Sequence, residues 1–356
     1  MGLPNINIEF KTAGTAAIGR SQKGVVGLIV KDANTAAKGQ HILTAAAEIP
    51  KTLGDDNKAY VARAFTGYIN PPKQVVVFVL GADAADLTEA LEFFALQQVD
   101  YFAGPANCTA DEAAAIANWI KTQRANEYTP KAVLPHHTAD SEGIVNFTTD
   151  EIKVKDKTYT TAQYCSRIAG LLAGTPMTIS CTYAPLPEIT DIKRLTKAQM
   201  DAAIDAGELI LYHDGEKVKI GRGVTGLTTL TDEKGEAFKK IKIVETVDMI
   251  RTDIRRTAQD SFIGKYPNSY DNKCLLITAV KGYFEQLELE GILARGKSQV
   301  GLDLAAQEAY LKANGTDTSK MNEQDVKEAE TGSNVFLQAK ISILDAVEDI
   351  NLAIAI

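Results

Sequence analysis

Apolar and polar residues alternate along the last part of the chain, Val335 to Ile356, which contains no glycine and no proline. A period of two predicts a β-strand that buries one face. The alternation slips by one residue between Ile343 and Leu344, which predicts a bulge or bend. Because a bare strand edge invites pairing, we expect another strand to cover it. The large apolar residues concerned are Val335, Leu337, Ile341, Ile343, Leu344, Ile350, Leu352, Ile354 and Ile356.

The start of the chain predicts a shorter strand of the same kind, in which Ile6, Ile8 and Phe10 alternate with polar residues. The stretch from Lys11 to Gly24 is small and polar, as is typical of a flexible arm. Before the terminal strand, residues 321–332 form a polar linker or short helix. Two interpretations remain open: each terminal strand is an edge strand of its own sheet, or it pairs with another copy. We expect the arms to hinge at Gly14, Gly19, Gly24 and Gly332.

The region from residue 25 to residue 238 alternates apolar runs with amphipathic stretches. The runs at 25–30 and 74–80 are continuous, which is typical of buried strands. Thr109 and Glu112 have the spacing of a capping box. Strands that alternate with helices predict a parallel sheet. The predicted strands are 25–30, 74–80, 101–103, 132–134 and 143–147, and the predicted helices are 59–65, 86–98 and 110–126.

Smaller elements complete this region. Asp214-Gly215 between two apolar runs predicts a β-hairpin over 208–220, with arms at 208–211 and 217–220. A polar hairpin is predicted over 152–159, and helices are predicted at 161–173 and 196–206. The sequence therefore continues the α/β region as far as residue 238.

From residue 239 the pattern becomes helical. Apolar residues keep one face along 243–262 and 271–293, whereas 301–314 fits either a helix or a loop. We therefore predict an arm (1–24), an α/β region (25–238), a helical domain with a linker (239–334) and a terminal strand (335–356). The predicted fold class is α/β with parallel strands in the first region and α+β overall.

Charge and composition narrow the kinds of partner. The net charge of the 356-residue chain is −8, which argues against nucleic acid. No apolar run reaches the roughly 18–20 residues of a membrane span, so we expect no membrane insertion. Residues 1–31 carry four basic residues and one acidic residue, whereas residues 321–356 carry two basic and seven acidic residues. Opposite charge favours pairing of one end with the other.

Motifs for catalysis, phosphate binding or metal binding are missing from the sequence. The glycines of GRGVTG follow a hairpin instead of opening a helix, so a phosphate cradle is not expected. His136 and His137 follow a predicted strand. We interpret them as two solvent-exposed loop residues, and the alternative is a metal-binding or catalytic role. We interpret Cys108 as a small buried core residue, and the alternative is a catalytic nucleophile. We therefore predict no enzyme activity, no cofactor and no metal.

Four segments together resemble the contractile phage tail sheath proteins, including the sheaths of phage-tail-like R-type bacteriocins. They are LPNINIEF with RSQKGVVGLI, the hairpin ELILYHDGEKVKIGRGVTGLTTL, the helical pair VETVDMIRTDIRRTAQDSFIGKYPNS and CLLITAVKGYFEQLELEGIL, and the ending AVEDINLAIAI. The resemblance covers most of the chain and is more specific in its last 150 residues.

The resemblance implies a structural role. Such subunits exchange their terminal strands and stack as rings, expected to be hexameric, around an inner tube. Contraction from a metastable extended state then drives the tube through a cell envelope. The implied partners are further copies of the chain, the tail tube protein, and baseplate and terminator proteins. The implied location is a phage or phage-tail-like particle assembled in the bacterial cytoplasm, with residues 239–320 facing the tube and the α/β region outward.

Two other functions remain as alternatives. One is a different strand-exchanging protein of a tail or surface layer, and the other is an α/β enzyme built on the sheet around residues 74–80. For the sheath, the implied intersubunit residues are Ile6, Ile8, Phe10, Val335, Leu337, Ile341, Ile343, Ile350, Leu352, Ile354 and Ile356.

Overall fold

The computed structural model describes residues 17–19 and 23–355. The chain divides into two compact units. We call the first, which contains residues 23–249 and 345–355, the α/β unit. The second, whose longest stretch is residues 250–344, is called the helical unit. The predicted division into an outer region 25–238 and an inner region 239–334 concerns an assembled sheath and stays a prediction.

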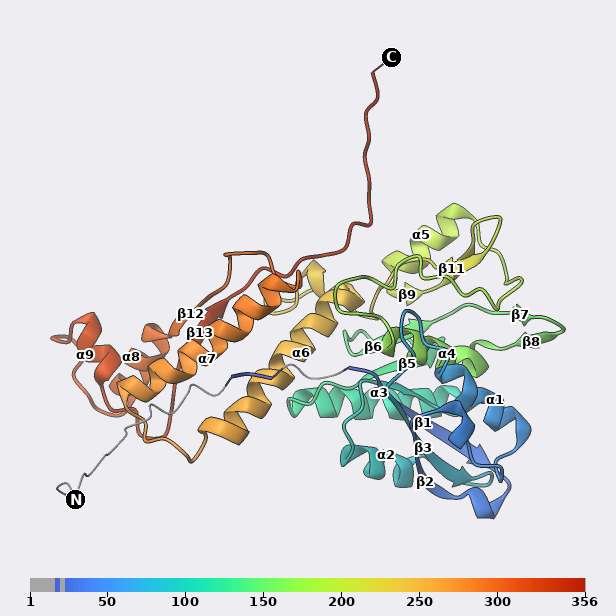
Figure 1. Cartoon of the computed structure of the whole chain (residues 1–356), viewed down its shortest axis with the longest axis horizontal. Helices are drawn as coiled ribbons and strands as arrows, with labels where there is room; N and C mark the ends of the chain where they lie inside the picture. Colours follow the sequence, from blue (N-terminus) through green and yellow to red (C-terminus); the bar gives the residue numbers. More distant parts are fainter. Residues whose placement is uncertain (1–16, 20–22, 356) are drawn as a thin grey trace, which may run out of the picture. The chain divides into compact units, whose positions relative to one another are not determined.

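A seven-stranded sheet forms the centre of the α/β unit, with the strand order β2-β3-β1-β4-β5-β6-β9 (Figure 1). All neighbours pair in parallel except β2, which is antiparallel to β3. The predicted parallel sheet is therefore confirmed, and β2 is an edge strand that the sequence analysis missed. The strands are β1 (Val25–Asp32), β2 (Gly39–Leu43), β3 (Gln74–Gly81), β4 (Tyr101–Ala103), β5 (Lys131–Pro135), β6 (Ile144–Phe147) and β9 (Glu208–Leu209).

Helices cover both faces of this sheet, which explains why its strands are continuous apolar runs. On one face Leu28 packs with residues of α1 (Asp55–Ala64) and α4 (Thr161–Ala173). On the other face Ile29 packs with residues of α2 (Thr88–Ala95) and α3 (Ala110–Ala125). The predicted capping box of Thr109 and Glu112 begins α3.

Short elements complete the α/β unit. β7 (Ile152–Val154) and β8 (Lys157–Tyr159) form the predicted polar hairpin, and α5 (Lys197–Asp205) follows. The hairpin predicted over 208–220 is wrong in its first arm. Its strands are β10 (Leu211–His213) and β11 (Val218–Ile220), because Glu208–Leu209 pairs with β6 in the large sheet. Short helical turns occur at Thr35–Ala37, Ala46–Glu48 and Glu236–Lys239.

The helical unit is built around α7 (Tyr270–Leu289) and the second half of α6 (Ile241–Thr257), whose last turn is a π-helix at Ala258–Phe262. Tyr283 of α7 donates a buried hydrogen bond of 2.7 Å to Asp253 of α6. α8 (Leu304–Ala313) and α9 (Glu323–Glu328) follow, so the segment 301–314 is mainly helical. β12 (Gln299–Leu302) and β13 (Leu337–Lys340) form a two-stranded antiparallel sheet. Within the described residues, no helix is both long and apolar enough to cross a membrane.

Candidate functional site: the C-terminal segment and its attachment

The C-terminal strand is much shorter than the sequence predicts. Only Leu337–Lys340 forms a strand, and its partner is β12 of the same chain. A single bridge joins Ile343 to Leu293, and the amide of Leu344 donates to the carbonyl of Ile292. Beyond Leu344, the described residues contain no strand that pairs with this segment. After Leu344 the described residues are assigned to no strand, so the long predicted strand is confirmed only at Leu337–Lys340.

Large apolar side chains of this last segment face solvent. Val347, Ile350, Leu352 and Ile354 are 75–85% exposed. Figure 1 draws the segment as an extended trace that ends at the label C. A row of exposed branched apolar residues on an extended backbone is a surface that another protein element is expected to cover. The side chains of Ile350, Leu352 and Ile354, which the sequence pattern predicts to alternate with smaller or polar residues, are thus exposed to solvent.

The other predicted interface residues lie in different surroundings. Val335 is 40% exposed, Leu337 belongs to β13, and Ile341 is half-buried. Ile343 takes part in the bridge to Leu293. The roles of these residues between subunits stay predictions. Ile6, Ile8, Phe10, Gly14 and Ile356 lie outside the described residues.

The predicted hinge glycines differ in their freedom. Gly24 is held at the start of β1, where its amide donates to Asp100 at 2.7 Å and a Cβ atom would lie 3.0 Å from the amide nitrogen of Lys73. Gly19 has open space around it. Gly332 adopts a positive φ of 57°, and its carbonyl accepts a hydrogen bond from Asn268. The hinge roles of these glycines stay predictions, and of the three described ones Gly24 is the most closely packed.

We call residues 345–349 the root of the C-terminal segment. Three acidic residues attach this root to the α/β unit. Asp345 pairs with Lys240, and Asp349 pairs with Arg222. Between them, Glu348 accepts hydrogen bonds from Thr182 at 2.5 Å and from Ser180 at 3.0 Å. Burial would raise the pKa of Asp345, but its hydrogen bond with Lys240 lowers it, so this carboxylate is ionised at neutral pH. The attachment is thus ionic.

Within the chain, the acidic residues at the root of the C-terminal segment have partners in the α/β unit, and the expected pairing between the two ends of the chain stays a prediction. In the part of the chain that the structure describes, the acidic residues at 345–349 pair with Arg222 and Lys240 of the α/β unit. Lys23, at the root of the N-terminal arm, instead lies 2.8 Å from Glu245. One feature of the sequence is consistent with this attachment: three acidic residues interrupt an otherwise apolar segment.

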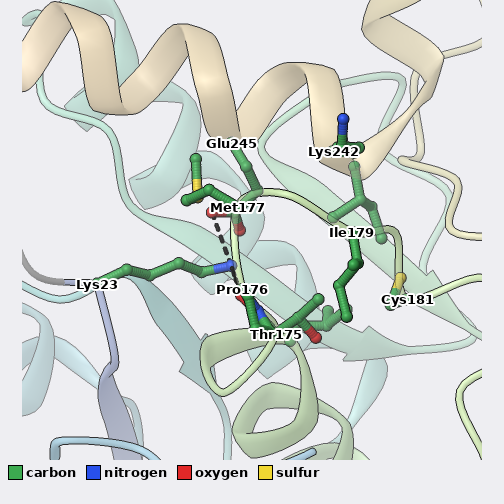
Figure 2. Close-up of a pocket in the computed structure, with 10 residues that line it drawn as sticks. Lys23, Thr175, Pro176, Met177, Ile179, Cys181, Lys242 and Glu245 are labelled. Atoms are coloured by element: carbon green, nitrogen blue, oxygen red, sulfur yellow. Dashed lines mark hydrogen bonds and ion pairs between the residues drawn. The ribbon is translucent and has the colours of Figure 1, made fainter. Parts of the chain in front are cut away.

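Glu245 also fixes the first half of α6 (Figure 2). Lys23 reaches this carboxylate from the start of β1, and Lys131 of β5 lies 3.9 Å away on its other side. Burial would raise the pKa of Glu245, but Lys131 and Lys23 lower it. Because both cations come from the sheet side of the unit, they hold α6 against it. The root of the N-terminal arm is thereby fastened to the same helix.

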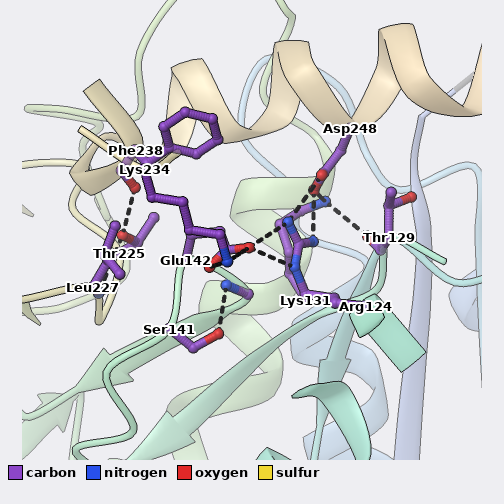
Figure 3. Close-up of polar contacts among 11 residues, drawn as sticks. Arg124, Thr129, Lys131, Ser141, Glu142, Thr225, Leu227, Lys234, Phe238 and Asp248 are labelled. Carbon is purple, nitrogen blue, oxygen red and sulfur yellow. Dashed lines mark hydrogen bonds and ion pairs between the residues drawn. The ribbon is translucent and has the colours of Figure 1, made fainter. Parts of the chain in front are cut away.

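A second ionic cluster lies one turn further along α6 (Figure 3). Arg124 of α3 donates two hydrogen bonds to Asp248, at 2.9 and 3.0 Å, and binds Glu142 at 3.2 Å. Lys131 adds a contact of 3.2 Å to Asp248, and Lys234 binds Glu142 at 2.9 Å. Burial alone would lower the pKa of Arg124, but Asp248 and Glu142 raise it. Paired and bidentate buried charges of this kind position two elements against each other.

The two candidate catalytic residues, His136 and Cys108, lie in different surroundings. Nε2 of His136 lies 2.8 Å from Asp150 and 2.9 Å from the hydroxyl of Thr161, beside a polar cavity of about 260 Å³. Burial raises the pKa of Cys108 to about 12, so its thiol is protonated at neutral pH. Within the described residues, no group of three or more His, Cys, Asp or Glu side chains could hold a metal ion.

Known proteins match the chain over nearly its whole length. The family models for the phage tail sheath protein central domain and the phage tail sheath C-terminal domain match residues 80–226 and 233–356. The tail sheath protein of Clostridium phage phiCD119 is 41% identical over 361 residues, which cover 99% of each chain.

Solved structures share the fold. A sheath protein in the contracted helical sheath of the anti-feeding prophage matches with a TM-score of 0.74 at 13% identity, over 100% of this chain and 99% of that one. The sheath tail protein of Desulfitobacterium hafniense matches with a TM-score of 0.70 at 17% identity, over 84% of this chain and 94% of that one. The predicted mixed α/β fold agrees with these structures. On the strength of the two domain models and the full-length relative, the chain belongs to the phage tail sheath protein family.

Proposed function

We propose that this chain is the subunit of a contractile tail sheath whose copies are joined by exchange of their terminal strands. The observation that carries the proposal is the exposed row of Val347, Ile350, Leu352 and Ile354 on an extended segment. A neighbouring subunit that pairs with this segment would satisfy its backbone and bury its apolar side chains. Membership of the phage tail sheath protein family supports this proposal.

The sheet of β12 and β13 is the proposed acceptor for exchanged strands. Each of these strands pairs on one side only among the described residues. A sheet of two strands is marginally stable in water, and added strands stabilise it. Residues 350–356 of one copy and residues 6–10 of another would extend this sheet at its two edges. The linked sheets would then connect subunits within and between rings.

The energy for contraction is proposed to be stored in the lattice of subunits. The sequence carries no nucleotide-binding motif, so a metastable extended assembly has to supply the driving force. The extended and contracted states need to differ in free energy by only a few kcal/mol per subunit, which is typical of two conformations of one protein, because this difference adds up over many copies. One similar structure is a sheath in the contracted state. The corresponding change in this chain would drive an inner tube through a target cell envelope.

Partners and location follow from the same proposal. Besides further copies of itself in stacked, hexameric rings, the sheath would contact the tail tube, a baseplate and a terminator protein. A structure similar to this chain comes from the baseplate of the anti-feeding prophage. The chain would assemble in the bacterial cytoplasm and remain part of a virion or tail-like particle.

Substitution of the exposed row tests the proposal. In the first variant Ile350, Leu352 and Ile354 are replaced by threonine, which keeps β propensity but removes apolar surface. In the matched control the alternate positions Asn351 and Ala353 are replaced by threonine. We expect the first variant to fold and sediment as a free subunit, whereas the control assembles as the natural chain does. Assembly of the first variant to the same extent as the control would contradict the proposal.

A further inference from the structure

The root of the C-terminal segment is held by a binding site for one carboxylate. We propose that Ser180, Thr182, Arg222 and Lys240 form a preorganised socket that binds Glu348 and so fixes where the segment leaves its own subunit. This Glu348 socket deepens the proposed function, because it leaves only residues 350–356 free to reach a neighbour. The ligand that the socket takes is a carboxylate on an extended peptide.

Burial distinguishes Glu348 from its neighbours along the segment. Its side chain is 6% exposed, whereas that of Asp349 is 78% exposed. One carboxylate oxygen accepts the hydrogen bonds of Thr182 and Ser180, and the other lies 3.2 Å from Nε of Arg222 and 3.8 Å from Nζ of Lys240. A carboxylate can leave water without large cost only where charges and hydrogen-bond donors replace its hydration.

The donors of the socket are oriented by contacts that do not involve Glu348. The amide of Thr182 donates to the hydroxyl of Ser180 at 3.1 Å. The amide of Gly223 donates to the hydroxyl of Thr182 at 2.9 Å. The Ser180 hydroxyl also lies 2.9 Å from the hydroxyl oxygen of Thr182, so its single proton can be donated either to Thr182 or to Glu348, whereas the Thr182 hydroxyl donates to Glu348. These backbone contacts restrict where the two hydroxyl oxygens can lie, which lowers the cost of ordering them around a carboxylate.

Gly223 permits this arrangement by the close approach of its backbone. A Cβ atom at this position would lie 2.7 Å from the sulfur of Cys181 and 3.3–3.4 Å from the hydroxyls of Ser180 and Thr182. Any larger residue would therefore disturb the two hydroxyls. This gives a physical role to the second glycine of the GRG sequence, for which no phosphate site was expected.

The socket divides the C-terminal segment into an attached part and a free part. Residues 345–349 carry the three acidic residues that pair with Lys240 and Arg222. Residues 350–355 carry the last three members of the exposed row, Ile350, Leu352 and Ile354, and within the described residues no hydrogen bond or ion pair joins them to the α/β unit. The joint between attached and free parts thus lies after Asp349, well beyond the hinge that the sequence predicts at Gly332.

Hydrogen exchange of the full-length, unassembled chain tests the socket. Amides of residues 345–349 are followed by mass spectrometry in the natural chain, in E348Q and in D349N, which removes the same charge from an exposed pair with the same arginine. We expect exchange to accelerate by about tenfold or more in E348Q, because removing one partner of a buried ion pair is costly. In D349N the increase should stay below about threefold, since exposed ion pairs contribute little.

A third variant keeps every charge in place. T182V removes one hydroxyl of the socket with little change of shape, and it should accelerate exchange of 345–349 while exchange of the large sheet stays unchanged. Unchanged exchange in E348Q, or equal effects of E348Q and D349N, would overturn the socket. Because these measurements use free subunits, their outcome is independent of whether the natural chain assembles, which tests the proposed function separately.

Discussion

Two glycines inside helices show how the surroundings of one residue decide its contribution. Gly170 of α4 lies against α1, and a Cβ atom there would come within 1.9 Å of the carbonyl oxygen of Ala64. Gly282 of α7 is exposed and has open space around it. Both residues look alike in the sequence, because each interrupts an apolar helical pattern. Only the first is required by close packing of two helices.

Alanine substitution of the two glycines should therefore have opposite effects. We expect G170A to lower the free energy of unfolding by about 1–3 kcal/mol, because a backbone carbonyl has to move. We expect G282A to raise it by about 0.5–1 kcal/mol, because alanine loses less conformational entropy in a helix. Urea unfolding of the free subunit, monitored by circular dichroism, measures both. A neutral or stabilising G170A would show that α1 and α4 do not pack this closely.

At the scale of secondary-structure elements, α6 is held to the sheet of the α/β unit by buried charges. Asp248 is the central carboxylate, since it binds both Arg124 and Lys131. Replacing Asp248 by asparagine removes the negative charge that neutralises the buried cations of Arg124 and Lys131. We expect D248N to destabilise the α/β unit by about 3–5 kcal/mol, the usual cost of breaking a buried ion pair.

An exposed ion pair close to α6 provides the matched control for this prediction. Glu236 is 73% exposed and pairs with Lys239 three residues later. E236Q should change the free energy of unfolding by less than about 1 kcal/mol. Equal midpoints of urea unfolding for D248N and E236Q would contradict the assignment of Asp248 as an anchor of α6.

The sequence predicted most elements whose signal is local. β1 and β3 are continuous apolar runs, and α3 begins at a capping box, so their positions follow from neighbouring residues alone. β2 was missed because GQHIL is short, contains glycine and histidine, and pairs only at the sheet edge. The hairpin was misplaced at Glu208–Leu209 because the partner of these residues, β6, lies about 60 positions earlier.

The candidate interface was predictable only in part. Alternation marked Ile350, Leu352 and Ile354, and these residues are exposed on an extended segment. The pattern did not reveal that Leu337–Lys340 pairs within the chain, because one strand does not encode its partner. The Glu348 socket was not foreseen either. It joins residues from positions 180, 182, 222 and 240, which only the folded chain brings together.

At the scale of the whole molecule, we propose that three features together link neighbouring subunits. They are the two terminal strands, the β12–β13 sheet, and the ion pairs that bind the start of each arm to the α/β unit. Where the described residues meet each arm, the chain is bound to the α/β unit, at Lys23 by Glu245 and at Glu348 by its socket. Such fixed roots would let a subunit rotate while the strands beyond them stay paired with neighbours. The proposed sheath function depends on this linkage between subunits.

The most direct test is a helical reconstruction by cryo-electron microscopy of the assembled protein. We predict that residues 350–356 of each subunit pair with the β12–β13 sheet of a neighbouring copy, while Glu348 stays in the socket of its own chain. A reconstruction in which residues 350–356 pack on their own subunit, with neighbours joined by other surfaces, would contradict it.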